Sequence, residues 1–287
     1  MKIKHFIKEH SVIVYFFIAF TISWGFVVIL TGPNNIPINT EKSQELLPFL
    51  YVSMLFGPSV AGIFLTGLLD GKTGFRKLMS RLLKWRVNIR WYALALLATP
   101  LLAFLLLLAL SLLSSEFQLN IFKSDNLASL LLNGIIAGVM VGIFEEIGWT
   151  GFIIPRLSQR YSILANGLIV GFLWGAWHFI LFWERESFFE ALPLLILLGR
   201  LFVWLPPFRV LMVWIYSRTE SLLLVILTHV SLVFTTTTLV PMTLTGISLL
   251  TWILIWGVLL WVVVFAIIVV NRRKLSEQPI DPGNNTN

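Results

Sequence analysis

Long apolar segments alternate with short polar ones along most of the chain. Eight are long enough to cross a bilayer, with approximate bounds 11–31, 46–69, 91–114, 127–154, 162–183, 191–216, 220–240 and 247–270. A helix needs about 20 predominantly apolar residues to span the hydrocarbon core. Because backbone polar groups in lipid must be satisfied within the segment, each is expected to be helical. The pattern predicts an all-α polytopic membrane protein with about eight transmembrane helices.

Two breaks in the pattern bear on individual helices. The second segment ends at Leu69-Asp70-Gly71, where glycine suits a left-handed helix cap. The sixth segment contains Pro206-Pro207 together with Arg200 and Arg209. Broken helices at membrane depth need protein or water neighbours, so we expect a kink or two half-helices there, facing other helices.

Composition supports a membrane protein and excludes some chemistry. Hydrophobic residues make up 57% of the 287 residues and charged residues 12%, and the mean hydropathy is +0.88. These values are too apolar for a soluble domain of this length. The chain has no cysteine, which excludes disulfides, thiolate metal ligands and a cysteine nucleophile.

Positive charge is distributed unevenly between the loops. Of the 21 Lys and Arg residues, 16 lie in the N-terminus, the 72–90 and 156–160 loops, at Arg218 and at 272–274. The alternate loops hold three, which are Lys42, Lys123 and Arg185. Cytoplasmic loops retain the excess of positive charge, so eight crossings in the plasma membrane with cytoplasmic N- and C-termini satisfy every loop. The net charge of +7 therefore indicates orientation, and we expect no nucleic-acid partner.

Residues 1–274 are expected to form a single membrane domain, since the chain shows no internal repeat and no second soluble unit. Within this domain, the 72–90 segment carries seven Lys and Arg residues interleaved with apolar ones. This is typical of a basic amphipathic helix lying on anionic lipid headgroups. Residues 275–287 are polar, and we expect them to form a cytoplasmic tail.

Two glutamates and two histidines stand inside the apolar segments. Glu145 and Glu146 lie in the fourth segment, His178 in the fifth and His229 in the seventh. An ionisable side chain at membrane depth costs at least ~2.5–3.5 kcal/mol on insertion scales, which favours a functional site. The alternative is a structural role, in which a histidine only forms a hydrogen bond to another helix or a glutamate only pairs with an arginine. The adjacent glutamates, His178 and His229 make three such positions on three helices, which favours one shared site.

Helical spacing assigns neighbours to these residues. Residues four apart share a face, whereas adjacent residues are rotated by about 100°. The pairs expected to share a face are Glu145 with Trp149, Glu146 with Thr150, Trp174 with His178, and His229 with Val233. Two adjacent carboxylates cannot both face one small cavity. We therefore expect one glutamate to meet water and substrate, and the other to be buried and held by hydrogen bonds.

A carboxylate, two imidazoles and water provide the groups needed for hydrolysis. The carboxylate can take a proton from water, and a histidine can stabilise an oxyanion or protonate a leaving amine. The alternative is a metal site, with Glu145, His178 and His229 as possible ligands of zinc or another divalent ion. The His-Glu-x-x-His pattern is absent. Thr228 and Ser231 beside His229 offer a weaker nucleophile hypothesis, because no Gly-x-Ser-x-Gly pattern occurs. No organic cofactor is indicated.

Three short motifs contain the candidate residues. They read Glu145-Glu146-Ile147-Gly148-Trp149-Thr150, Trp174-Gly175-Ala176-Trp177-His178 and His229-Val230-Ser231-Leu232-Val233. They resemble the motifs of the CAAX protease and bacteriocin-processing family, glutamate-dependent intramembrane endopeptidases that include the type II CAAX prenyl endopeptidases. The family pattern is Glu-Glu-x-x-x-Arg, aromatic-x-x-x-His and His-x-x-x-Asn on successive helices. The resemblance covers roughly residues 128–237.

The resemblance implies a role for each motif residue. Glu145 would activate water, with Glu146 as its support. His178 and His229 would complete a catalytic centre between the fourth, fifth and seventh helices. The aromatic position of the second motif is Trp174, where phenylalanine is usual.

Two positions depart from the family pattern. Thr150 stands where an arginine steadies Glu146, and Val233 stands where an asparagine helps to hold the oxyanion. Valine cannot donate a hydrogen bond, and the loss of one oxyanion donor costs about 2.7–4 kcal/mol. The hydroxyls that could substitute are those of Ser231, Thr235 and Thr236.

The missing arginine leaves Glu146 without its nearest expected cation. The carboxyl group must then stay protonated or pair with an arginine from another segment. The candidates are Arg200 and Arg209, and we favour Arg209, because the adjacent Pro206-Pro207 break could turn it inward.

The sequence thus favours an intramembrane endopeptidase that cleaves membrane-tethered or prenylated-type peptides at a site open toward the cytoplasm. A second reading is a weak or inactive member that binds peptides, such as a bacteriocin immunity protein. A third is a proton-coupled transporter that uses the buried glutamates and histidines as a relay.

Overall fold

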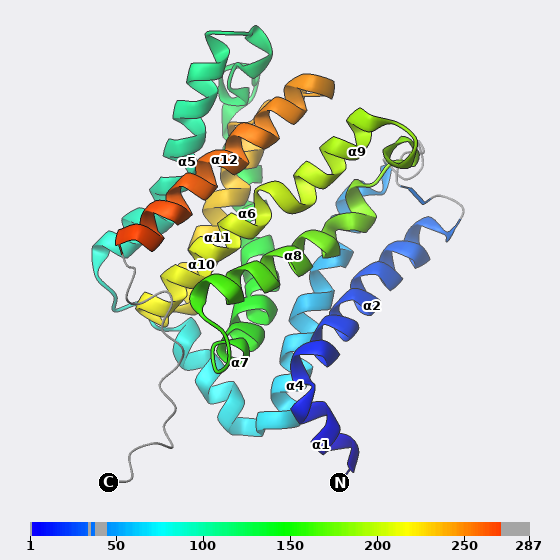
Figure 1. The fold of residues 1–287 in the computed structure, drawn as a ribbon, viewed down its shortest axis with the longest axis vertical. Helices are drawn as coiled ribbons and strands as arrows, with labels where there is room; N and C mark the ends of the chain where they lie inside the picture. The colour runs from blue at the N-terminus through cyan, green and yellow to red at the C-terminus, as the bar shows by residue number, and fades with distance from the viewer. Residues whose placement is uncertain (1, 34–35, 38–44, 271–287) are drawn as a thin grey trace.

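The computed structural model describes residues 2–33, 36–37 and 45–270. Every regular element in these ranges is helical, and the longest helices form a tilted bundle (Figure 1). Within the described part of the chain, seven spans are long and apolar enough to cross a membrane: Ser11–Thr31, Leu47–Leu82, Ile89–Ser111, Leu127–Leu157, Ile163–Phe182, Ala191–Thr219 and Gly246–Val270. The chain is therefore an all-α, multi-pass membrane protein, as the apolar pattern predicted. Lys42, residues 272–274 and the predicted tail at 275–287 lie outside the described residues.

The remaining predicted segment, 220–240, forms the shorter apolar helix α11 (Leu222–Thr238). Its 17 residues extend over about 25 Å at 1.5 Å per residue, somewhat less than the hydrocarbon thickness. Protein surrounds much of this helix, because it packs against α6 (Leu127–Gly148), α5 (Ile89–Ser111) and α10 (Leu205–Thr219).

The N-terminal helices form one side of the bundle. After α1 (Lys2–Glu9), α2 (Ser11–Thr31) packs against α4 (Leu47–Leu82), and the Ser23 hydroxyl donates to the Met54 carbonyl at 2.6 Å. A Cβ atom on Gly57 would lie 2.3 Å from the Ala19 carbonyl oxygen, so this approach requires glycine. Further along, α4 bends at Gly71, whose φ of +58° and ψ of −145° are non-helical and favour glycine, so this residue makes a kink inside α4 where the sequence predicted a left-handed cap. The helix then crosses the bottom of the bundle in cyan (Figure 1).

The basic 72–90 segment is helical only as far as Leu82, where α4 ends. Asn88 instead starts the next helix, α5, because its side chain accepts a hydrogen bond from the Arg90 N–H at 3.1 Å. The basic residues are thus divided among the end of α4, the connection that contains Lys84 and Arg86, and the start of α5, a difference from the continuous helix expected from sequence.

Two spans contain wide π-helical turns. The fourth consists of α6, the π-helical segment η4 (Trp149–Ile153) and α7 (Ile154–Leu157). The sixth consists of α9 (Ala191–Leu198), the π-helical segment η6 (Gly199–Val203) and α10, which starts after Trp204. Pro206 and Pro207 lie in the first turn of α10, where missing N–H donors are tolerated. The sixth span is therefore two half-helices, as its prolines predicted.

The other elements complete the bundle. They are α8 (Ile163–Phe182), α12 (Gly246–Val270) and the short 3-10 turns η2 (Ser115–Phe117), η3 (Asn120–Phe122) and η5 (Arg185–Phe188). The Ser162 hydroxyl caps α8 by accepting from the Ala165 N–H at 3.3 Å.

Glycine seams bring the site helices together. Along α6, a Cβ on Gly138 would lie 2.8 Å from the Val230 carbonyl oxygen of α11. Along α8, a Cβ on Gly171 would lie 2.6 Å from Pro206 Cα of α10. Because the backbones approach this closely, side chains at the same depth on α6, α8, α10 and α11 converge.

Candidate active site

The candidate residues come from four helices. Glu145 and Glu146 lie at the end of α6, Trp174 and His178 on α8, and His229 on α11. The structure adds α10, which contributes Arg209, to the three helices that the sequence motifs indicated.

Glu145 is held by two indole groups. Its Oε2 atom accepts from Trp174 Nε1 at 2.7 Å and from Trp149 Nε1 at 3.2 Å. Trp149 follows Glu145 by four residues, so this hydrogen bond is the contact that helical spacing predicted. The side chain is 2% exposed, and no described residue donates a hydrogen bond to Oε1. One carboxylate oxygen is thus fixed, while the other is left for a ligand such as water.

Glu146 is held by polar side chains from its own span and from α10 and α11. Its Oε2 atom accepts from Arg209 Nη1 at 2.8 Å and from the Thr150 hydroxyl, and its Oε1 atom lies 2.8 Å from His229 Nδ1. Both Glu146 and Arg209 are 0% exposed. The two adjacent glutamates therefore differ in environment, and Glu146 is the one held by charge.

Arg209 supplies the cation that position 150 lacks. Of the two candidate arginines, Arg209 is the one expected from its position beside Pro206-Pro207. The other, Arg200, instead lies over Phe182, with Cζ 5.3 Å from the ring centre. The Arg209 guanidinium also lies over the Trp174 ring, 4.4 Å from its centre. A buried guanidinium that is both paired and stacked is fixed in orientation, so it orients Glu146.

The hydrogen bonds of the histidines determine which ring nitrogen carries the proton. His178 Nδ1 lies 2.8 Å from the Trp174 carbonyl oxygen, which can only accept. His229 Nδ1 faces the Glu146 carboxylate, which also accepts from Arg209. Both Nδ1 atoms are therefore donors, which leaves each Nε2 with a lone pair when the ring is neutral. His178 is partly exposed, whereas His229 is 1% exposed.

Trp174 connects residues that do not bond one another directly. Its ring lies edge-on to His229, with centroids 5.3 Å apart, and edge-on to His178 at 5.6 Å. Its N–H donates to Glu145. The structure thus gathers Glu145, His178 and His229 around one indole, without a hydrogen bond between any two of them.

The hydroxyls near Val233 are already engaged as donors. Ser231 donates to the Leu96 carbonyl at 3.0 Å, and Thr235 donates to the Ser231 carbonyl at 2.6 Å. Thr236 donates to the carbonyl of Val233 itself at 3.0 Å. None of the three replaces the missing asparagine in this conformation.

The metal hypothesis finds no assembled ligand set here. Among the described residues, no group of three or more His, Asp or Glu side chains is arranged to hold a metal ion. The expected ligands Glu145, His178 and His229 surround Trp174 instead of converging on one point.

An aromatic wall behind Trp149 was not anticipated from sequence. Trp149 packs against Tyr15, Phe16 and Trp177, with centroids 5.5, 5.5 and 5.8 Å away. The sequence feature that could have indicated these contacts is Tyr15, an aromatic residue with a polar hydroxyl in the first apolar segment. This wall fixes the indole that holds Glu145.

Comparison with known proteins finds similarity over the part of the chain that contains the site. The family model described as "Type II CAAX prenyl endopeptidase Rce1-like" matches residues 127–235, a range that includes every site residue from Glu145 to Val233. CAAX prenyl protease 2 of Methanococcus maripaludis is 29% identical over 94 residues, or 32% of this chain. The matched region spans about a third (35%) of that relative's length. Residues 127–235 are thus similar to the Rce1-like type II CAAX prenyl endopeptidases, the group that the three motifs resemble.

Proposed function

We propose that the protein is an intramembrane endopeptidase in which Glu145 activates water. The observation that carries this proposal is the asymmetric environment of Glu145: two indole donors fix Oε2, and no described residue donates to Oε1. A water bound at Oε1 would lose a proton to the carboxylate as its oxygen attacks the scissile carbonyl. The C–N bond then breaks, and the proton passes to the leaving amine.

His229 is suited to stabilise the charge that develops on the carbonyl oxygen. Its Nδ1 lies 2.8 Å from Glu146 Oε1, which fixes the ring orientation, and when the ring is protonated its Nε2–H can donate to the substrate's carbonyl oxygen. A donor fixed before the reaction reduces the reorganisation that the transition state requires. Glu146 and Arg209 act as positioning residues for His229, because neither needs to touch the substrate.

His178 is suited to contact the leaving group. It is the partly exposed member of the site, and its Nδ1 is tied to the backbone of its own helix. Its Nε2 lone pair can accept from the departing amine or from a bound water.

The substrates we propose are peptides tethered to the membrane, including peptides of the prenylated type. The name of the similar protein, CAAX prenyl protease 2, and the burial of the site among apolar helices both support this class. We further propose that the protein lies in the plasma membrane with cytoplasmic termini, that its site opens toward the cytoplasm and that its 72–90 segment contacts anionic headgroups.

A second candidate is a peptide-binding protein without catalysis, such as a bacteriocin immunity protein. Val233 supports it, because the neighbouring hydroxyls are engaged elsewhere and no asparagine is present to hold the oxyanion. A proton-coupled transporter would use the same buried groups, although the family match favours hydrolysis.

The test uses purified protein in liposomes with a panel of membrane-tethered peptides. The wild type should cleave, and Glu145→Gln, which keeps an oxygen for the indole donors, should bind peptide without cleaving. Peptide binding without wild-type cleavage would favour the immunity reading, and pH-driven flux would favour transport. Elemental analysis and activity after exhaustive chelation test the metal hypothesis separately.

A further inference from the structure

A second arginine of the sixth span lies close to the candidate active site. Arg200 belongs to the π-helical segment η6, which packs against α8, and α8 runs beside this span in Figure 1. The approach is close, because a Cβ on Gly175 of α8 would clash with the Leu201 carbonyl oxygen. Gly175 lies between Trp174 and His178 in the chain. The π-helical turn that carries Arg200 therefore meets α8 beside two of the site residues.

Phe182 connects Arg200 with His178. It follows His178 by one helical turn on α8, and the two rings stack with centroids 5.7 Å apart and an interplanar angle of 13°. Arg200 Cζ lies 5.3 Å from the centre of the same phenyl ring. His178, Phe182 and Arg200 are all partly exposed, in contrast to the buried glutamates. Their contacts thus lead from the histidine suited to contact the leaving group to a cation.

The Arg200 guanidinium has no carboxylate partner in the described part of the chain. The ion pairs found there include Arg209 with Glu146 but none that involves Arg200. Glu184 and Tyr51 are near enough to act on its charge, although neither forms a hydrogen bond with it. A charged side chain within a membrane span is costly and favours a functional role. The planar guanidinium fork matches a carboxylate, so a ligand that brings one would supply the missing partner.

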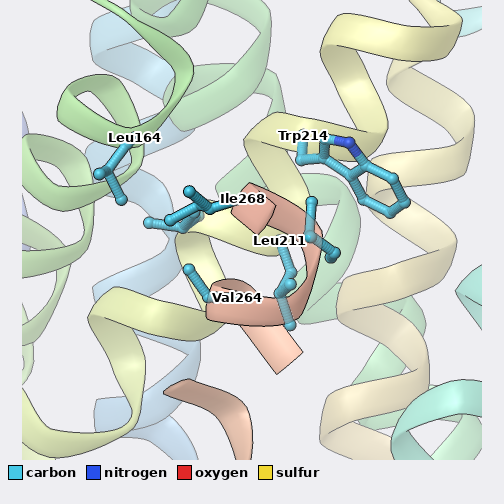
Figure 2. Close-up of a pocket in the computed structure, with 7 residues that line it drawn as sticks. Leu164, Leu211, Trp214, Val264 and Ile268 are labelled. Carbon is cyan, nitrogen blue, oxygen red and sulfur yellow. The ribbon is translucent and has the colours of Figure 1, made fainter. Parts of the chain in front are cut away.

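An apolar hollow elsewhere in the bundle does not offer this chemistry. It lies beside the last turns of α12 and is lined by hydrophobic side chains such as Leu211, Trp214 and Val264 (Figure 2). None of its lining residues carries a charge. A peptide carboxylate would find no cation to pair with there, whereas it would find one beside Phe182.

We propose that Arg200 binds a carboxylate on the part of the peptide that leaves after cleavage, and that this part lies along Phe182. The inference rests on the proposed endopeptidase function, because it places the leaving amine at His178. An extended peptide advances about 3.3 Å per residue, so the carboxylate lies within a few residues of the cleaved bond. It is either the C-terminus of the peptide or an acidic side chain. Arg200 thus determines specificity and takes no part in the chemical step.

The test measures peptide affinity in the non-cleaving Glu145→Gln protein, solubilised in detergent. Three lipid-anchored peptides differ only near their C-terminus: one ends in a free carboxylate, one in an amide, and one in an amide preceded by a glutamate. A peptide whose carboxylate reaches Arg200 should bind about tenfold more tightly than the neutral amide, the effect of one hydrogen-bonded charge pair. Whether the free C-terminus or the glutamate gives this gain identifies the source of the carboxylate.

Variants of Arg200 are then compared in the same background. Arg200→Gln should weaken only the peptide that showed the gain and bring it to the affinity of the neutral amide. Arg200→Lys should retain part of the preference, because it keeps the charge. Arg185→Gln, which removes an exposed cation from the neighbouring turn η5, is the matched control and should leave all three affinities unchanged.

Three results would overturn the proposal. The first is equal affinity for all three peptides when Arg200 is intact, a comparison that does not depend on the folding of any Arg200 variant. The second is an equal loss for neutral and carboxylate peptides in Arg200→Gln, which would indicate a structural role. The third is an equal loss in Arg185→Gln and Arg200→Gln, which would indicate diffuse charge attraction. Cleavage of the same peptides by the wild type tests the endopeptidase function separately. An Arg200-dependent preference without cleavage would contradict the chemistry and retain the carboxylate site.

Discussion

Arg209 Nη1 lies 2.8 Å from Glu146 Oε2, and both side chains are completely buried. Breaking such a pair leaves one uncompensated charge in the core. Arg209→Gln should therefore destabilise the protein by about 3–5 kcal/mol. Adding Glu146→Gln should recover much of the loss, as measured by unfolding in a double-mutant cycle. Additive losses would show that the two residues are not coupled.

Thr150→Arg tests whether an arginine at position 150, where the family pattern has one, can pair with Glu146 in place of Arg209. The new arginine is one helical turn from Glu146, so it should restore part of the stability lost in Arg209→Gln. In the wild-type background it should instead be harmful, because Thr150 is 1% exposed and a second cation would be buried there without an additional carboxylate. Thermal unfolding of the four variants provides the comparison.

Trp174→Phe keeps the ring over which Arg209 lies and removes only the donor to Glu145. A hydrogen bond to a charged group contributes about 1.5–3 kcal/mol, so kcat should fall by roughly tenfold or more. Trp149→Phe is the matched control, since its bond to Glu145 is longer, at 3.2 Å, and its loss should be smaller. Unchanged kcat in both variants would contradict the proposed fixing of Glu145.

Val233→Asn should raise kcat, because it adds an amide donor one turn from His229. The gain should not exceed about a hundredfold, the lower end of the cost of removing an oxyanion donor in other enzymes. Val233→Leu, which adds bulk without a donor, is the control. A gain in both variants would point to packing instead of hydrogen bonding.

Gly138→Ala should loosen the seam between α6 and α11. The added Cβ would lie 2.8 Å from the Val230 carbonyl oxygen, so the helices must separate, and the distance between Glu146 and His229 would grow. Overpacking typically costs about 1–3 kcal/mol, and activity should fall with stability. Gly25→Ala, where nothing lies within 4 Å of the added atom, should be neutral in both measurements.

Topology can be tested with introduced cysteines, because the chain has none of its own. Lys123→Cys and Ser80→Cys are both at exposed positions. An impermeant thiol reagent added to intact cells should label position 123 and spare position 80. The reverse pattern would invert the orientation derived from the distribution of positive charge.

The sequence predicted the helices well because membrane length and backbone hydrogen bonding constrain them strongly. It also identified the glutamates and histidines, since polar groups in apolar segments are rare and costly. The continuous helix expected over 72–90 was wrong, because α4 ends at Leu82 and the Asn88 N-cap starts α5, a local signal that the charge pattern obscures.

The contacts among the site residues were harder to foresee. Whether an indole N–H points at Glu145 depends on how Trp174 and Trp149 rotate against rings from distant helices. The choice between Arg200 and Arg209 could be argued only from the neighbouring prolines. Such relationships depend on packing between segments, which periodicity along one helix does not encode.

The π-helical turn at Trp149–Ile153 determines the direction of the Arg156 side chain, which follows it in the chain. Arg156 is seven residues after Trp149. In an uninterrupted α-helix, this spacing would place both residues on nearly the same face, about two turns apart. A π-helical turn accommodates about one extra residue, which rotates everything after it by about 100°. Arg156 is instead directed to the protein surface, where it pairs with Asp70. If the same residues kept regular α-helical geometry, this cation would be redirected toward the helix face that carries Trp149 and Glu145, so the register of a single turn separates a surface charge from the active site.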